Sequence, residues 1–184
     1  MSTSTTKWVL DPTHSEIGFK IKHLMITNVS GNFNKFEVLA KTNGDDFSNA
    51  QISANIEVDS INTNNAQRDE HLRTADFFEA EKYPVISFKS NRIQKVDDEN
   101  FNLIGELTIK ETTKPVKLVL EYGGVTKDPY GNVKAGFSLS GKINRHDFGV
   151  SFNAILETGG VALGEDIKIN GEIQLVKQLE LEPA

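Results

Sequence analysis

Along most of the chain, apolar residues occupy every second position. Ile17, Phe19 and Ile21 alternate with small or polar residues. Such alternation predicts strands with one buried and one polar face, as in antiparallel sheets. Turn-forming residues such as Asn43-Gly44 and those at 128–132 separate the runs. The pattern predicts eight strands, at about residues 14–23, 29–41, 50–60, 84–91, 100–110, 115–124, 131–143 and 165–177. We interpret residues 150–157 as part of a long loop and not as a ninth strand.

Residues 64–78 depart from this alternation. Within this stretch Ala66, Leu72, Ala75 and Phe78 lie three or six positions apart. An asparagine begins the stretch, and acidic residues follow in its first part. Asparagine is a favourable N-cap and early acidic residues suit a helix start. One or two short helical turns are therefore predicted near residues 64–78, before Tyr83-Pro84 restarts the sheet.

The length of the strands favours a closed barrel. Several predicted strands have about 8 to 13 residues, beyond the usual five or six. Long antiparallel strands must hide their edges, and closure does this completely. An all-β fold with eight strands gives a barrel just wide enough for side chains or one slender ligand. Without repeats or linkers, we expect one domain over residues 1–184, with its core at about 7–177 and polar termini.

Two glycines bear on whether this barrel is hollow. Gly105 lies between two inward-facing leucines, and Gly171 lies between two inward-facing isoleucines. A glycine inside a strand packs nothing, and marks a bend or a close approach by another group. Bending of the barrel explains these glycines about as well as a cavity does, so the pattern leaves both open.

Composition and charge exclude several classes of protein. Twenty basic and 26 acidic side chains give a net charge of −6, which disfavours nucleic acid as a partner. The absence of cysteine excludes disulfides, thiolate metal sites and a cysteine nucleophile. No run approaches the roughly 20 apolar residues of a membrane span. The polar, uncharged start of the chain lacks the features of a secretory signal, so a cytoplasmic location is expected.

The sequence carries no recognisable catalytic or cofactor motif. The four histidines, His14, His23, His71 and His146, do not show the close pairing of a metalloenzyme. A nucleophile elbow, a phosphate-binding loop and a dinucleotide fingerprint are also missing. We therefore expect no metal, no cofactor and no catalytic residue.

Two clusters of mixed charge have two interpretations each. Arg68-Asp69 lies in the predicted helical stretch, and Arg145-His146-Asp147 lies in a loop. Either cluster could be a structural ion pair or cap that holds a loop over the barrel. Either could instead form a polar rim that recognises the head group of a ligand.

Several motifs in order resemble the YceI-like family of lipid-binding proteins, over about residues 7–177. The match is made by the following segments: Trp8-Val-Leu-Asp-Pro-Thr-His-Ser15, Lys22-His23-Leu24, Val29-Ser-Gly31-Asn-Phe33, Arg68-Asp69-Glu-His71-Leu72, Asp76-Phe77-Phe78, Tyr83-Pro-Val-Ile-Ser-Phe88-Lys-Ser90, Gly105-Glu-Leu107-Thr-Ile109, Thr113-Lys-Pro-Val116 and Ile143-Asn-Arg145-His-Asp-Phe148-Gly149. One departure is local: Lys110-Glu111-Thr112 stands where the family commonly has a His/Arg-Gly pair. We expect Glu111 to alter this hairpin and the tunnel mouth.

The resemblance implies an extended, eight-stranded, lipocalin-like barrel whose tunnel holds a long apolar chain. Members of this bacterial family bind polyisoprenoids, such as prenylated quinones or prenyl diphosphates, or fatty-acid amides. The implied function is non-catalytic binding, storage or transport of such a lipid. Several members form homodimers, which leaves a homodimer open here.

Strand phase and the resemblance together nominate ligand-contact residues. The expected lining residues are Phe19, Ile21, Phe33, Ile56, Phe88, Leu107, Phe137 and Ile169, and the expected mouth residues are His14, Arg68, Asp69 and Arg145. Two rival functions remain. One is a stress-related protein-interaction module with a filled barrel, and the other is an enzyme that acts on a lipid, suggested by Arg145-His146-Asp147.

Overall fold

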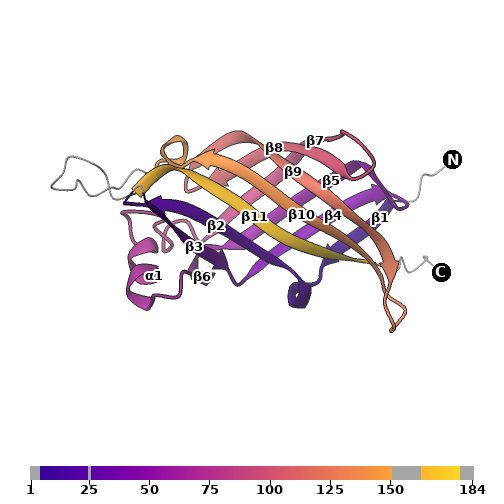
Figure 1. Ribbon diagram of the computed structural model, residues 1–184, viewed down its shortest axis with the longest axis horizontal. Helices are drawn as coiled ribbons and strands as arrows, with labels where there is room; N and C mark the ends of the chain where they lie inside the picture. Colours follow the sequence, from indigo (N-terminus) through magenta and orange to yellow (C-terminus); the bar gives the residue numbers. More distant parts are fainter. Residues whose placement is uncertain (1–4, 25, 151–162, 179–184) are drawn as a thin grey trace.

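The computed structural model describes residues 5–24, 26–150 and 163–178, which form an elongated barrel (Figure 1). The strands are β1 (Thr5–Leu10), β2 (Glu16–His23), β3 (Thr27–Phe33), β4 (Phe36–Asn43), β5 (Asp46–Glu57), β6 (Ile61–Asn62), β7 (Val85–Lys95), β8 (Asn100–Ile109), β9 (Thr112–Lys127), β10 (Val133–Asn144) and β11 (Leu163–Lys177). The helical elements are α1 (Ala66–Leu72) and the short 3-10 helices η1 (Pro12–His14), η2 (Val58–Ser60) and η3 (Arg145–Phe148).

All strand pairings are antiparallel, and they close on themselves. The order is β1-β4-β5-β7-β8-β9-β10-β11, and β11 pairs back with β1. The strands β2, β3 and β6 continue β1, β4 and β5 beyond short interruptions, since β2 pairs with β11 and β3, and β3 pairs with β6. Eight continuous or interrupted strands thus surround one interior, which confirms the eight-stranded antiparallel barrel.

The first strand differs most from its predicted bounds. It includes Thr5–Leu10, which the prediction omitted because the short run Trp8-Val-Leu10 shows no alternation. Asp11-Pro12 interrupts it, since proline cannot donate a ladder hydrogen bond. The Asp11 side chain accepts a hydrogen bond from Thr13 N at 3.1 Å and so caps η1. A second break, at residues 34–35, divides the strand predicted at 29–41.

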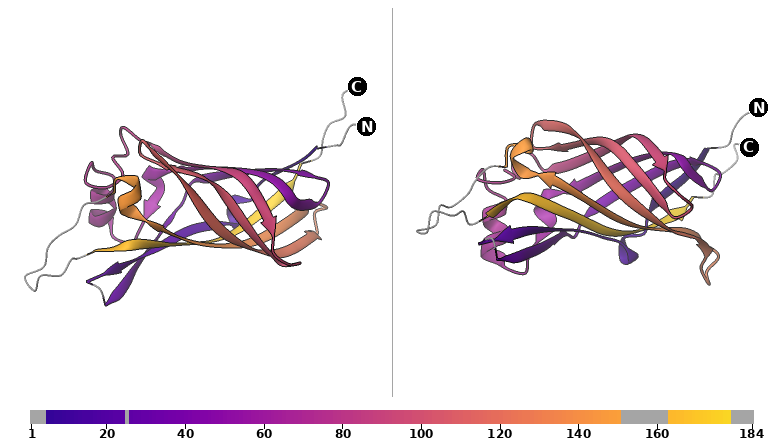
Figure 2. Two further views of the ribbon diagram at one scale, coloured as in Figure 1. Left: turned by 90° about the horizontal axis from the view of Figure 1, so that it is seen from above. Right: turned by 45° about the horizontal axis from the view of Figure 1, so that its top comes forward.

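One end of the barrel carries the helical elements. Helix α1 begins after Asn65, whose side chain accepts a hydrogen bond from Arg68 N at 3.0 Å. This confirms the short helical segment expected near residues 64–78. Figure 2 shows α1 and η3 together at this end, away from the start of β1 and the end of β11. In the described part of the chain, no helix is long and apolar enough to cross a bilayer. Of the loop expected at 150–157, only Val150 lies within the described residues.

Aromatic side chains fill the half of the barrel nearest β1. The Phe47 ring packs on Trp8 and on Phe137, both at 5.0 Å between centroids. Tyr122 packs on Phe137 at 5.2 Å and on Phe101 at 6.1 Å. Centroid separations of this size are van der Waals contacts between rings. These five residues are called the aromatic plug below.

Candidate ligand-binding cavity

The other half of the barrel encloses an apolar cavity of about 310 Å³. It lies at the end that carries α1 and η3. Its apolar wall consists of Ile17, Phe19, Ile21, Val29, Phe33, Ile56, Leu72, Phe77, Phe78, Ile86, Leu107, Ile109, Ile143, Phe148, Val150, Leu163, Ile167 and Ile169. The remaining lining residues are Gly18, His23, Thr63, Arg68, His71 and Arg145, so no acidic residue lines the described cavity.

The cavity ends at a layer of three inward-facing glycines. On β8, β10 and β11 the last wall residue is Leu107, Ile143 and Ile169, respectively. In each strand a glycine follows two positions deeper into the barrel, and these glycines are Gly105, Gly141 and Gly171. None of the three lines the cavity.

A large side chain from a neighbouring strand covers each of these glycines. A Cβ on Gly105 would lie 2.6 Å from Phe88 Cζ, and one on Gly141 would lie 2.6 Å from Leu118 Cδ2. A Cβ on Gly171 would lie 3.1 Å from Leu139 Cδ2. The sequence left open whether the glycines mark a bend of the barrel or a cavity. The structure shows that a side chain of the protein itself approaches each of them.

Phe88, Leu118 and Leu139 cover these glycines directly below the last wall residues, although none of the three lines the described cavity. We call this layer of glycines and covering side chains the floor. The aromatic plug fills the barrel beyond this floor. The cavity is therefore blind, and the expected tunnel occupies only one half of the barrel. The structure also differs from the wholly filled barrel assumed in the protein-interaction alternative, since the half beside α1 contains the apolar cavity.

Thr63 links two charged residues of α1. Arg68 Nε donates to Thr63 Oγ1 at 2.8 Å, and Arg68 Nη2 donates to Thr63 O at 2.6 Å. Asp69 is buried, and its Oδ1 accepts from Thr63 N at 2.9 Å and also from Thr63 Oγ1. Arg68 and Asp69 are thus connected by hydrogen bonds that both residues form with Thr63. The arrangement fixes the Arg68 guanidinium at the cavity wall while Asp69 holds the segment in place.

Arg145 enters the cavity from η3 and is 2% exposed. Its Nε donates to Gly164 O at 2.9 Å and its Nη1 donates to Val150 O at 2.9 Å. Burial lowers the pKa of the Arg145 guanidinium, and the Glu165 carboxylate partly opposes this effect. These bonds tie η3 to the start of β11.

Two histidines of the cavity were not among the expected ligand-contact residues. His71 lies one helical turn after Arg68 on α1, and its Nε2 is 2.8 Å from Asp76 Oδ2. Residues three apart on a helix share a face, so this spacing was a usable signal for His71. His23 stands at the end of β2, where nothing in the sequence pattern distinguishes it.

Eight of the twelve expected ligand-contact residues line the cavity: Phe19, Ile21, Phe33, Ile56, Arg68, Leu107, Arg145 and Ile169.

The other four lie elsewhere. Phe88 is in the floor, Phe137 is in the aromatic plug, and Asp69 is buried against Thr63. His14 lies in η1 on the outer surface, with a side chain that is 60% exposed. Alternation identifies which face of a strand is buried but not the depth along the barrel, which explains the position of Phe88 and Phe137. Ligand contact by any of the twelve stays a prediction.

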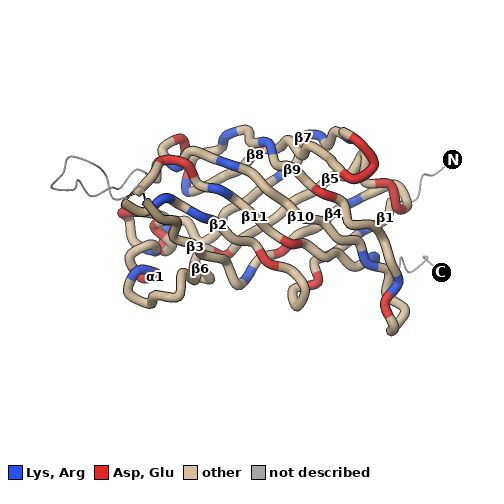
Figure 3. The backbone as a smooth tube through the Cα atoms, in the orientation of Figure 1, with Lys and Arg blue, Asp and Glu red and all other residues tan. Residues whose placement is uncertain are grey.

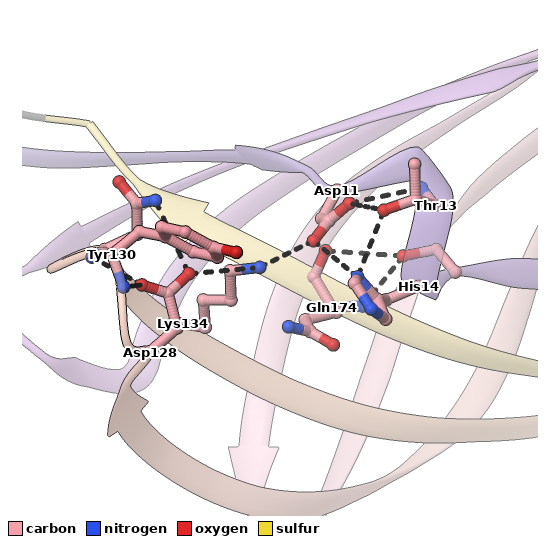
Figure 4. Close-up of polar contacts among 9 residues, drawn as sticks. Asp11, Thr13, His14, Asp128, Tyr130, Lys134 and Gln174 are labelled. Carbon is pink, nitrogen blue, oxygen red and sulfur yellow. Dashed lines mark hydrogen bonds and ion pairs between the residues drawn. The ribbon is translucent and has the colours of Figure 1, made fainter.

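His14 belongs to a polar cluster outside the cavity, shown in Figure 4. Lys134 Nζ lies 2.8 Å from Asp11 Oδ2 and 3.5 Å from Asp128 Oδ2. His14 Nδ1 is 2.9 Å from Asp11 Oδ2. The hydrogen bond from Lys134 is the main reason that the pKa of Asp11 is lowered strongly. The cluster joins the β1–β2 turn to the β9–β10 hairpin, so it stabilises the barrel and not the cavity.

Glu111 occupies the tight β8–β9 turn. Lys110 adopts a positive φ of 58° there, and the Tyr83 hydroxyl donates to Glu111 Oε2 at 3.3 Å. Glu111 is not among the residues that line the cavity. The hairpin carries the unusual φ at Lys110, and an effect of Glu111 on the tunnel mouth stays a prediction.

A second hollow lies where β5 and β7 separate, and its volume is about 630 Å³. Lys41, Lys89 and Arg92 contribute to its mostly polar wall. An apolar chain would gain little free energy from contact with such a wall.

The outer surface of the barrel carries charges of both signs (Figure 3). His146 and Asp147 are exposed on this surface. They do not line the cavity, so the cluster with Arg145 gives the enzyme hypothesis no support.

Comparison with known proteins gives one consistent result. The model of the family described as "YceI-like domain" matches residues 8–175 of this chain. A UPF0312 protein of Staphylococcus aureus strain N315 is 39% identical over 92% of this chain and 96% of its own length.

Solved structures show the same fold. The YCEI protein of Campylobacter jejuni has 38% identity and a TM-score of 0.72, over 92% of this chain and 97% of that chain. BcnA of Burkholderia cenocepacia has 21% identity and a TM-score of 0.76, over 90% of this chain and 98% of that chain. A polyisoprenoid-binding domain from Saccharophagus degradans has 12% identity and a TM-score of 0.67, over 93% of this chain and 98% of that chain. The last two similarities establish the fold alone.

Proposed function

The chain belongs to the YceI-like domain family, and from this premise we propose that it binds a lipid without catalysis and holds the lipid's apolar chain in the barrel cavity. The observation that carries the proposal is the blind cavity beside α1, whose described lining residues include 18 apolar side chains and no carboxylate. The candidate ligand classes are a polyisoprenoid, a prenylated quinone and a fatty-acid derivative. Storage and transport are the roles that such binding would serve.

The driving force for binding is the removal of apolar surface from water. Each buried methylene contributes about 0.8 kcal/mol before costs. Ordering a flexible chain reduces this gain, and drug-sized ligands retain only about 0.3 kcal/mol per atom. Ten buried carbons give about 8 kcal/mol before these costs and about 3 kcal/mol at the value for drug-sized ligands. Apolar contact alone therefore gives an affinity between about millimolar and about micromolar.

The cavity residues fall into two roles under this proposal. Phe19, Ile21, Phe33, Ile56, Leu107 and Ile169 contact the chain, because their side chains form the wall. Arg68 and Arg145 interact with the polar end of the lipid, because they are the only lysine or arginine side chains among the described lining residues.

Mass spectrometry of an organic extract tests the proposal. Protein purified under native conditions should release a lipid with an aliphatic chain. The variant Ile169→Trp should purify folded and release little lipid, since its larger side chain fills the cavity. Val119→Trp serves as the matched control, because Val119 is 40% exposed on the outside of β9.

The three samples lead to different outcomes. Lipid in the wild type and in Val119→Trp, with its loss in Ile169→Trp, supports binding inside the barrel. An extract without lipid from protein that also fails to bind added lipid contradicts the proposal. Undiminished lipid in Ile169→Trp contradicts the assigned site.

A further inference from the structure

We propose, on the basis of the lipid-binding function above, that the ligand is a single-chain lipid with an anionic head group and a buried segment of about ten carbons. Three properties of the cavity support this: its volume, its floor, and the sign of the charges at its wall. Each property restricts one feature of the ligand.

The volume of the cavity sets the number of buried carbons. A water molecule occupies about 30 Å³ in the liquid, and a methylene group is of similar size. A cavity of about 310 Å³ therefore accommodates roughly ten carbons. A polyprenyl chain of about 40 carbons would need about 1,200 Å³ on the same measure. Most of such a chain would stay outside this cavity.

The floor prevents a longer lipid chain from extending deeper into the barrel. Phe88, Leu118 and Leu139 lie on the three inward-facing glycines, with no space left between side chain and backbone. Behind them, the aromatic plug has ring centroids 5.0 to 6.1 Å apart. Interiors packed in this way open only at a considerable cost in free energy. A longer chain therefore cannot thread deeper without moving several buried side chains.

The width of the barrel restricts the ligand to one chain. An eight-stranded barrel has an interior just wide enough for side chains or one slender ligand. Branched side chains from most of its strands narrow this interior further. These are the isoleucines of the cavity wall on β2, β5, β7, β8, β10 and β11, namely Ile17, Ile21, Ile56, Ile86, Ile109, Ile143, Ile167 and Ile169.

The charged groups of the cavity wall favour an anion. Its titratable lining residues are two arginines and two histidines, and none is acidic among those described. Arg68 Nε and Nη2 bind Thr63, while Nη1 has no hydrogen-bond partner within the described residues. A guanidinium fixed in this way is suited to a carboxylate or a phosphate oxygen. Both head groups share this chemistry, and the test separates them.

A titration of the full chain with straight-chain carboxylates measures the buried length. Calorimetry with chains of about 8 to 20 carbons, below their micelle-forming concentrations, should show about fourfold tighter binding per added methylene. The increase should stop soon after about ten to twelve carbons. A continued increase towards the longest chain would overturn the length limit, as would tighter binding of a 40-carbon polyprenyl phosphate.

A variant of the floor tests the cause of the limit. Leu139→Ala removes three carbons from the floor, so the plateau should move to chains about three carbons longer. Leu175→Ala is the matched control, because Leu175 lies two inward positions beyond Gly171 on β11 and is 3% exposed in the filled half. It should leave the plateau unchanged. A plateau that does not move in Leu139→Ala would show that the floor does not set the length.

The head group is tested with probes of equal chain length. Dodecanoate and dodecyl phosphate should bind at least about tenfold more tightly than dodecanol, and the stronger of the two identifies the head group. Arg68→Gln should weaken the binding of the two anions far more than the binding of dodecanol, while Arg68→Lys should retain part of the preference for anions. Equal losses for the anions and for dodecanol in Arg68→Gln would overturn the assignment.

These outcomes separate the inference from the function on which it rests. If no probe of any length or head group binds, the lipid-binding proposal fails. If long or neutral chains bind best, lipid binding stands and the inference about length and charge fails.

Discussion

The Phe88 ring lies against the backbone of Gly105, so closely that a Cβ on Gly105 would be 2.6 Å from Phe88 Cζ. Phe88 is directly opposite Leu107, the last cavity residue of β8. The contact therefore marks the boundary between the hollow and the filled half of the barrel. A glycine is required there because any side chain would occupy the space of the ring.

Gly105→Ala should destabilise the barrel. The added methyl would lie 2.5 Å from Lys89 O as well as against Phe88, and the backbone oxygen cannot move cheaply. Overpacking of this kind typically costs about 1 to 3 kcal/mol. Chemical denaturation at neutral pH measures the free energy of unfolding.

Gly136→Ala is the control for this substitution. A Cβ on Gly136 would meet no atom within 4 Å, so the free energy of unfolding should stay the same or rise by about 0.5 kcal/mol. Equal losses in both variants would show that the cost comes from strand glycines in general and not from the contact with Phe88.

Thr42→Val should weaken the aromatic plug. Trp8 is fully buried, and its indole Nε1 donates to Thr42 Oγ1 at 2.8 Å. Valine keeps the shape but leaves this buried donor without its acceptor, which should cost about 2 kcal/mol. The thermal midpoint, followed by the fluorescence of Trp8, should fall.

An exposed threonine pair provides the comparison. Thr108 Oγ1 and Thr113 Oγ1 are 2.8 Å apart on the surface. Thr113→Val should change the free energy of unfolding by no more than about 0.5 kcal/mol. If Thr42→Val is equally mild, the hydrogen bond to Trp8 does not support the plug.

The alternation of apolar residues predicted the barrel but could not predict its filling. Period two assigns a residue to the inner face, and Phe137 and Ile169 both satisfy it. Only the stagger of the strands places Phe137 in the plug and Ile169 on the cavity wall. For the same reason, the sequence could not show whether Gly105 marks a bend of the barrel or a cavity. The structure shows that the Phe88 ring packs against Gly105.

The polar residues of the cavity were only partly predictable. Arg68 and Arg145 stood out as charges in clusters with acidic neighbours. Their hydrogen bonds run to Thr63 and to backbone carbonyls, and backbone partners leave no trace in a sequence. Strand β1 escaped prediction because its short apolar run shows no alternation, and its pairing with the distant β4 and β11 is not visible in the sequence.

Asp11→Asn should make stability less dependent on pH. The bond from Lys134 lowers the pKa of Asp11 in the folded protein, while the unfolded value is about 3.9. The carboxylate therefore stabilises the fold above about pH 4 and loses this effect as pH falls through the lowered folded pKa.

The measurement compares the two proteins at two pH values. At pH 7 the variant should unfold about 1 kcal/mol more easily, a value that allows for solvent screening. The difference should shrink at about pH 3 and below. A constant difference across this range would contradict the role of the Asp11 charge.

Asp69→Ala should reduce both stability and the preference for anions. The substitution leaves Thr63 N and Thr63 Oγ1 without their buried acceptor, which should cost about 2 kcal/mol or more. It also loosens Thr63, which positions Arg68, so dodecanoate should lose more affinity than dodecanol. Asp76→Ala removes a half-exposed partner of His71 instead, and should change stability by less than about 1 kcal/mol.

The central claim is that a lipid chain enters the barrel beside α1 and ends at the floor. A crystal structure with 12-bromododecanoate locates the chain end directly, because the terminal bromine gives an anomalous signal. The account predicts the bromine in van der Waals contact with Phe88 or Leu139, and the carboxylate near Arg68. A bromine outside the barrel, in the polar hollow between β5 and β7, or beyond the floor within the aromatic plug would contradict it.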